Sequence, residues 1–170
     1  AIFPWSSQAR GFFLKTQEFE GAMHVANPNL EEQNRVWSDE NNLERRRRCF
    51  ELAEKKGFDD SLMLDSRGYV AESTGANIFY VKKNKLYTPI ADCFLNGITR
   101  KTVIQIAKKN NIKVIEKRIL PKELLKADEI FLTGTAVEIT PVSQIDSKKF
   151  SVGEVTKKLL SLFSSLVKGN

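Results

Sequence analysis

The chain has 170 residues, of which 41% are hydrophobic and 28% charged, and a formal net charge of +6. This length fits one folded domain with at most a sizeable appendage, and the composition excludes collagen-like, low-complexity and disulfide-scaffold proteins. No apolar run approaches the roughly 20 residues that span a bilayer, and the first residues lack the basic flank and apolar stretch of a secretion signal. With only two cysteines, a cytoplasmic protein without a membrane partner is expected.

The first 56 residues carry weak signals for secondary structure. A strand is predicted over residues 11–16, and residues 43–56 have the spacing of a helix with a thin apolar face. From residue 57 the pattern becomes regular. The chain is therefore predicted to divide into a lead segment, 1–56, and a folded domain, 57–170.

Strands and helices alternate through the predicted domain. A short strand over 61–65 runs into a turn of Asp, Ser and Gly residues. The elements predicted after it are a hairpin (76–81 and 86–88, turning at 83–85), a helix (97–110), a strand (112–116), a short helix (121–125), two strands (129–133 and 137–142) and a last helix (152–167). This mixture indicates an α+β or α/β fold with a mixed or barrel-like sheet.

The residues present disfavour several kinds of site. With one histidine, His24, a Ser-His-Asp triad or a histidine-rich metal site would depend on that residue alone. The cysteines form no CxxC pair, so no metal site is predicted. The glycine-rich loops that bind phosphates or dinucleotides do not occur, which disfavours nucleotide hydrolysis and dinucleotide redox chemistry. The basic residues at 45–48 and in lysine pairs lack interleaved aromatic residues, so nucleic acid is not expected as a partner.

Two places suggest a site for an anionic ligand, and a third place carries an unusual carboxylate. Residues 96–100 put a glycine and a threonine where a helix is predicted to begin, and the N–H groups at a helix start suit a phosphate. Residues 133–136 end a strand in small residues, which lets backbone amides approach a ligand. Glu72 is a carboxylate beside a loop of small residues. Each also has an ordinary explanation: a helix cap, a glycine that ends a strand, and a carboxylate bonded to its own loop.

Five segments occur in one order along the chain: residues 64–79, 86–89, 95–100, 127–131 and 134–142. In this order they resemble the C-terminal domain of the fold-type IV (class IV) pyridoxal-phosphate-dependent aminotransferases. That family includes branched-chain amino acid aminotransferases, D-amino acid aminotransferases and aminodeoxychorismate lyases, and the last segment is most similar to the branched-chain enzymes. The resemblance implies an α+β, D-amino acid aminotransferase-like fold, a pseudo-barrel of strands flanked by helices.

The same resemblance implies a site for pyridoxal 5′-phosphate. In the family a carboxylate faces the ring nitrogen and keeps it protonated, so that the ring can accept electrons; by motif this residue is Glu72. The phosphate would lie at the helix start that follows Gly97, on the backbone N–H groups of Ile98 and Thr99. The hydroxyl of Thr135 would be a further ligand.

The implied reaction transfers an amino group between a branched-chain amino acid and 2-oxoglutarate. The substrate α-carboxylate would meet the backbone of Thr135 and Ala136, and the partners would be amino acid and 2-oxo acid substrates. Because family members build their active sites at dimer interfaces, a homo-oligomer is expected, or a partner chain that supplies the missing half. A D-amino acid aminotransferase or a lyase relative is the alternative within the family.

The family's catalytic lysine has no counterpart at its usual place. By the family's spacing it falls at Ser38 or Asp39, and no lysine occurs between Lys15 and Lys55. The resemblance also leaves the family's first domain absent or reduced to a stub, with 1–56 as a remnant of the inter-domain region. Three interpretations follow: an inactive fragment, one piece of a split enzyme whose partner brings the lysine, or a binding and interaction module that keeps the fold.

Overall fold

The computed structural model describes residues 51, 53, 55, 57–135 and 137–169. Its strands and helices are, in chain order, β1 (Leu62–Leu64), β2 (Val70–Ser73), β3 (Asn77–Lys82), β4 (Lys85–Pro89), α3 (Ile98–Lys109), β5 (Val114–Lys117), α4 (Pro121–Leu124), β6 (Glu129–Gly134), β7 (Glu138–Pro141), β8 (Gln144–Ile145), β9 (Lys148–Lys149) and α5 (Glu154–Lys168). The strand predicted over 11–16 lies outside the described residues. Of the helix predicted over 43–56, the described positions 51, 53 and 55 are helical. The boundary at residue 57 stays a prediction.

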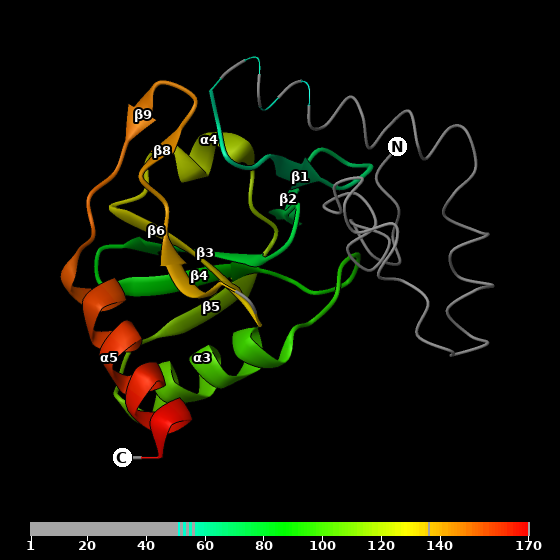
Figure 1. Cartoon of the computed structure of the whole chain (residues 1–170). Coiled ribbons are helices and arrows are strands. Elements are labelled where there is room, and N and C mark those ends of the chain that lie inside the picture. The colour runs from blue at the N-terminus through cyan, green and yellow to red at the C-terminus, as the bar shows by residue number, and fades with distance from the viewer. Residues whose placement is uncertain (1–50, 52, 54, 56, 136, 170) are drawn as a thin grey trace, which may run out of the picture.

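Five strands form a mixed sheet in the order β5-β4-β3-β6-β7. β4 and β5 run parallel, and the other neighbouring strands run antiparallel. Helices α3 and α5 cover one face, whereas α4 and the β1–β2 pair lie at the other (Figure 1). The α+β fold is therefore confirmed. The strands expected to form a pseudo-barrel are divided between this sheet and the smaller β1–β2 sheet.

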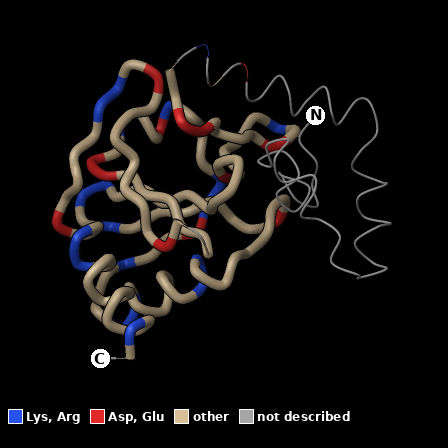
Figure 2. The backbone as a smooth tube through the Cα atoms, viewed as in Figure 1, with Lys and Arg blue, Asp and Glu red and all other residues tan. Residues whose placement is uncertain are grey.

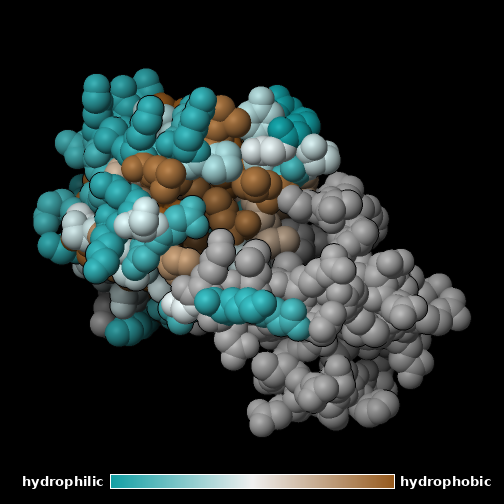
Figure 3. Space-filling view, turned by 90° about the horizontal axis from the view of Figure 1, so that it is seen from above, coloured by the Kyte–Doolittle hydropathy of each residue, from teal (hydrophilic) through white to brown (hydrophobic). Residues whose placement is uncertain are grey.

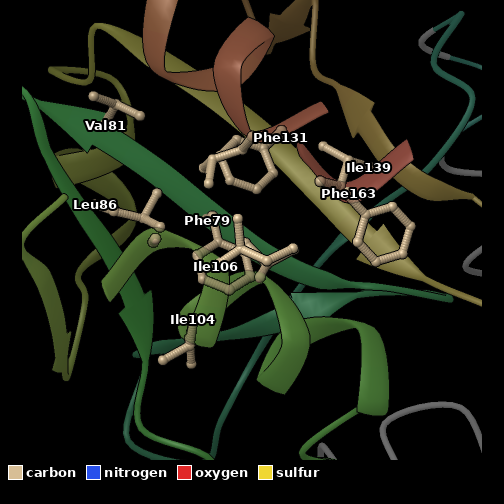
Figure 4. Close-up of a cluster of buried hydrophobic side chains, with 11 residues drawn as sticks. Phe79, Val81, Leu86, Ile104, Ile106, Phe131, Ile139 and Phe163 are labelled. Atoms are coloured by element: carbon tan, nitrogen blue, oxygen red, sulfur yellow. The ribbon is translucent and has the colours of Figure 1, made fainter. Parts of the chain in front are cut away.

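Two hydrophobic cores lie on opposite faces of the sheet, because successive residues of a strand point to opposite sides. Phe79 and Phe131 point toward α3 and α5, whereas Ile78 and Ile130 point toward β2 and α4. The rings of Phe79 and Phe131 belong to cross-strand partners and stack with their centroids 5.1 Å apart. Figure 4 shows both rings among the side chains of the first core.

The second face of the sheet is less completely covered. Leu120 and Leu125 at the ends of α4 are 36% and 40% exposed, and Leu62, Val142 and Phe150 pack against the core there while remaining partly accessible. Seen from this side, apolar side chains lie among hydrophilic ones (Figure 3).

Charged residues are spread over the described chain (Figure 2). Lys82 pairs with Asp128 at 2.7 Å and Lys117 with Glu123 at 2.6 Å, so part of the basic excess is balanced locally. Among the described residues no helix is both long enough and apolar enough to cross a membrane. The absence of a nucleic-acid partner stays a prediction.

The hairpin predicted between β3 and β4 is confirmed. Lys82 is the cross-strand partner of Lys85, so the loop consists of Lys83 and Asn84 alone, with φ angles of 50° and 57°. Two consecutive residues with positive φ are typical of a type I′ turn, whose twist matches that of the flanking strands. The loop is thus one residue shorter than the sequence pattern indicates.

Helix α5 is anchored at its start by a carboxylate from the sheet. Glu129, the first residue of β6, is buried and accepts hydrogen bonds from the N–H groups of Val155 (3.3 Å) and Thr156 (2.8 Å). These N–H groups lie in the first turn, where the helix itself offers no acceptor. Gly153 leaves room for this contact, because a Cβ atom there would lie 2.2 Å from the Glu129 carboxyl group.

Replacing Glu129 with alanine is therefore expected to lower the free energy of unfolding by about 2 kcal/mol, the range of a strong helix cap. Urea denaturation followed by circular dichroism measures this change, and hydrogen exchange locates it. The matched control is Glu154→Ala, whose side chain is 89% exposed and forms a surface ion pair with Lys157; a cost under about 0.5 kcal/mol is expected there. Unchanged exchange protection of the first turn of α5 in Glu129→Ala would contradict the capping role.

Candidate functional site

The start of helix α3 offers backbone N–H groups to a ligand. The helix begins at Ile98, its cap residue is Gly97, no side chain caps it, and its first turn contains no acidic residue. The N–H groups of the first turn have no acceptor within the helix, and the positive end of the helix dipole lies there. Ile98 is 83% exposed. The helix start that the sequence predicts as a phosphate site is thus present and open to solvent.

Two side chains hold the loop that precedes this helix, one from strand β3 and one from the helix itself. Asn77, the first residue of β3, donates to the Leu95 carbonyl (2.9 Å) and accepts from the N–H of Gly97 (3.2 Å). Arg100, one turn into α3, donates to the Asn96 side chain at 2.7 Å. Each residue of the 95–97 loop is therefore fixed by a hydrogen bond before any ligand arrives.

The Asn77 side chain approaches the backbone of residue 97 so closely that only glycine fits there. A Cβ atom at this position would lie 2.6 Å from Asn77 Oδ1, well inside van der Waals contact. The absence of a side chain lets the Asn77 amide bond the backbone at the point where α3 begins. Asn77 itself is only 5% exposed, so it has little room to move aside.

Glu72 lies next to the same asparagine. It belongs to β2, all four residues of which are buried, and is itself 6% exposed. Its Oε2 atom accepts a hydrogen bond from Asn77 Nδ2 at 3.0 Å. The turn that joins β2 to β3 is closed by the Ser73 N–H and hydroxyl, which both donate to the Ala76 carbonyl. This turn brings Glu72 and Asn77 to the same end of the sheet.

The end of β6 lies at this end of the sheet as well. Thr133 is the cross-strand partner of Asn77, and Gly134 packs against the β2–β3 turn, with its Cβ position 3.4 Å from the Gly75 carbonyl. Thr135 follows and is exposed. The Thr133 hydroxyl is buried and has no hydrogen-bond partner among the described residues.

The structure thus brings together features that the sequence indicates separately. Asn77 joins Glu72 to Gly97, the residue that precedes Ile98 and Thr99 at the start of α3. The end of β6, which Thr135 follows, lies beside them. Ala136, Ser38 and Asp39 lie outside the described residues. The roles of all these residues stay predictions.

Cys93 is the other side chain that could carry chemistry, as a nucleophile. Burial, with Asp92 beside the thiol, raises the pKa of Cys93 to about 11, so Cys93 is a neutral thiol at pH 7 and not an activated nucleophile. No cluster of three or more potential metal ligands occurs among the described residues.

Sequence reasoning assigned no role to Asn77 and Arg100. Both stand inside the segments that carry the family resemblance, 64–79 and 95–100. Their position in those segments was the available signal, since a single amide or guanidinium group indicates no particular chemistry by itself.

The chain is similar in sequence to a known family of proteins. A family model described as "Amino-transferase class IV" matches residues 32–145. Branched-chain-amino-acid aminotransferase of Pseudomonas aeruginosa is 46% identical over 116 residues, which cover 66% of this chain and 38% of that protein.

Two solved structures extend the comparison. Branched-chain aminotransferase of Thermoproteus uzoniensis, solved with norvaline, superposes with a TM-score of 0.68 at 42% identity and covers 71% of this chain and 41% of that one. An aminotransferase of Brucella abortus bound to the cofactor PLP gives a TM-score of 0.69 at 34% identity and covers 72% and 44%. The chain therefore spans about two fifths of the length of the relatives it matches, and since the family model covers more than half of it, the chain belongs to the class IV aminotransferases.

Proposed function

We propose that this chain binds pyridoxal 5′-phosphate and forms the cofactor-holding part of a branched-chain-type aminotransferase. The observation that carries the proposal is the meeting of three features at one end of the sheet. These are a buried carboxylate, a helix start without a side-chain cap, and a strand that ends at Gly134 and is followed by Thr135. The relatives named as branched-chain aminotransferases and the Brucella abortus structure with bound PLP support it.

The described residues fit the chemical groups of this cofactor. Glu72 offers a buried carboxylate to a protonated ring nitrogen, and a charge-assisted hydrogen bond of this kind is strong where water is excluded. The N–H groups of Ile98 and Thr99 offer donors to a phosphate, with the helix dipole favouring its negative charge. The Thr135 hydroxyl adds a donor just after the end of β6, which lies beside the start of β3. When bound, the cofactor supplies a pyridine ring that accepts an electron pair from the substrate.

We further propose that the substrates are an amino acid, of the branched-chain type, and the 2-oxo acid that accepts its amino group. The substrate carboxylate would be bound by backbone groups of Thr135 and Ala136. The expected lysine, at Ser38 or Asp39, is missing, and no lysine lies between Lys15 and Lys55. This chain would therefore hold the cofactor reversibly, and amino transfer would need a lysine from outside these 170 residues.

The first test mixes the purified chain with pyridoxal 5′-phosphate and records the absorbance spectrum before and after borohydride reduction, followed by mass spectrometry. The expected result is binding that dialysis reverses, without a reduced adduct on any single lysine. A specific adduct on one lysine would show that this chain carries its own catalytic lysine. Failure to bind at all would refute cofactor binding.

Glu72→Gln is expected to weaken the binding of pyridoxamine 5′-phosphate roughly tenfold or more, because the amide keeps the shape and an acceptor oxygen but loses the charge opposite the ring nitrogen. Binding of inorganic phosphate, which touches only the helix start, is expected to stay unchanged. Isothermal titration calorimetry measures both affinities, with Glu154→Gln on the exposed face of α5 as the charge-matched control. Equal losses for both ligands would argue against the assigned role of Glu72.

A further inference from the structure

One amide group connects the two ends of the candidate site. Asn77 Nδ2 donates to Glu72 Oε2 at 3.0 Å and to the Leu95 carbonyl at 2.9 Å, and Asn77 Oδ1 accepts from the Gly97 N–H at 3.2 Å. A primary amide has two N–H donors, so both are used here. The partners lie on β2 and on the loop before α3, so this one side chain bridges the two segments.

The three bonds require the shape and chemistry of asparagine. The group must donate twice and accept once from a side chain short enough to fit beside Gly97, whose Cβ position would lie 2.6 Å from Asn77 Oδ1. Aspartate has no N–H to donate and would place a second carboxylate beside Glu72. Glutamine is one methylene longer, and because Asn77 is only 5% exposed, the extra methylene would have to fit inside the protein.

Burial makes these bonds effective in fixing positions. Asn77 is the first residue of β3, and its cross-strand partner Thr133 is 1% exposed, so the backbone around the amide is held by the central pair of strands. Buried hydrogen bonds of this kind restrict their partners to one orientation, because an alternative orientation would leave polar groups unpaired. The Glu72 carboxylate and the Gly97 N–H are thus oriented by the same rigid group.

We propose that Asn77 is a positioning residue that sets both halves of the cofactor site at once, aiming the Glu72 carboxylate at the cofactor ring and fixing the start of α3 for the phosphate. This inference rests on the proposed function. It differs from a role in one half alone, since a loss of Asn77 would weaken binding of the ring and of the phosphate separately, whereas a loss of Glu72 would weaken binding of the ring alone.

The test measures the affinities of the full chain and its Asn77→Ala variant for pyridoxamine 5′-phosphate, pyridoxamine and inorganic phosphate, by NMR titration or calorimetry. Asn77→Ala is expected to weaken pyridoxamine and phosphate each by roughly fivefold to tenfold, the effect of about one hydrogen bond on each side. The matched control is Asn110→Ala. Asn110 also donates from Nδ2 to a backbone carbonyl, that of Ile106 at 2.9 Å, but at the far end of α3, so unchanged affinities are expected.

A second measurement uses the native chain and does not depend on the variant folding. In ¹⁵N-labelled protein, the Asn77 side-chain amide signals are expected to shift when either pyridoxamine or phosphate is added alone, while those of Asn110 stay in place. A purely structural asparagine would respond to neither ligand. A response to only one ligand, or an Asn77→Ala variant that loses affinity for only one, overturns the inference while cofactor binding stands. A native chain that binds none of the three ligands overturns the proposed function and this inference together.

Discussion

Replacing Arg100 with methionine is expected to lower the free energy of unfolding by about 3 kcal/mol, since it removes a buried guanidinium group that makes four hydrogen bonds and leaves buried acceptors without a donor. The guanidinium group is 1% exposed. It donates to the Pro89 carbonyl (2.8 Å), to Glu116 (2.7 Å), to the Asn96 side chain (2.7 Å) and to the Thr88 hydroxyl (3.3 Å). Methionine fills most of the volume, so the loss reports on polar bonds and not on a cavity.

The consequences of this change extend to the candidate site. Without Arg100, the Asn96 side chain loses its donor, and of the two side chains that hold the 95–97 loop Asn77 remains. We expect phosphate affinity to fall along with stability. Urea denaturation followed by circular dichroism measures the free energy of unfolding. Phosphate titration at urea concentrations below the unfolding transition measures the phosphate affinity of the folded protein.

Glu116→Gln is the control for this prediction. The Glu116 side chain is 44% exposed, so water solvates it in the absence of Arg100, and glutamine still offers an oxygen to the guanidinium group. The expected cost is below about 1 kcal/mol. An Arg100→Met variant as stable as the native chain would contradict the prediction, since it would mean that burying the guanidinium group costs as much free energy as its four partners return.

The elements of the fold could be predicted where they depend on neighbours in the chain. The β3–β4 hairpin followed from alternating apolar residues around a polar turn, and α3 from its apolar spacing after Gly97. The short β8–β9 pair was not predicted. Its strands have two residues each, and the pair is exposed at Lys148–Lys149, so no hydrophobic alternation marks it in the sequence.

The parts of the candidate site could be predicted, but their arrangement could not. A helix start and a strand end are local features, and Glu72 stood out as a carboxylate beside a loop of small residues. The role of Asn77 depends on residues 18 and 20 positions further along the chain, and these contacts exist only once β3 has paired with its neighbours and α3 has packed. The Glu129 cap of α5, with partners 26 and 27 positions away, could not be predicted for the same reason.

Phe131→Ala is expected to have the largest effect on stability of any change considered, about 4 kcal/mol, because a fully buried aromatic side chain is lost and a cavity remains. Phe131 is completely inaccessible, stacks on Phe79 and lies in the core under α3 and α5. Phe150→Ala is the size-matched control. Phe150 is half-buried at the edge of the second core, so its loss is expected to cost less than about 2 kcal/mol. Denaturant unfolding of the two variants measures the difference.

A milder variant separates the core from the candidate site. Phe131→Leu is expected to cost about 1.5 kcal/mol and to leave the affinity for pyridoxamine 5′-phosphate within roughly twofold of the native value. The reason is that the register of Asn77 with Thr133 is set by the backbone ladder between β3 and β6, which the stacked rings support but do not define. A loss of affinity in Phe131→Leu as large as that in Asn77→Ala would contradict this separation, and would place the control of site geometry in the aromatic core.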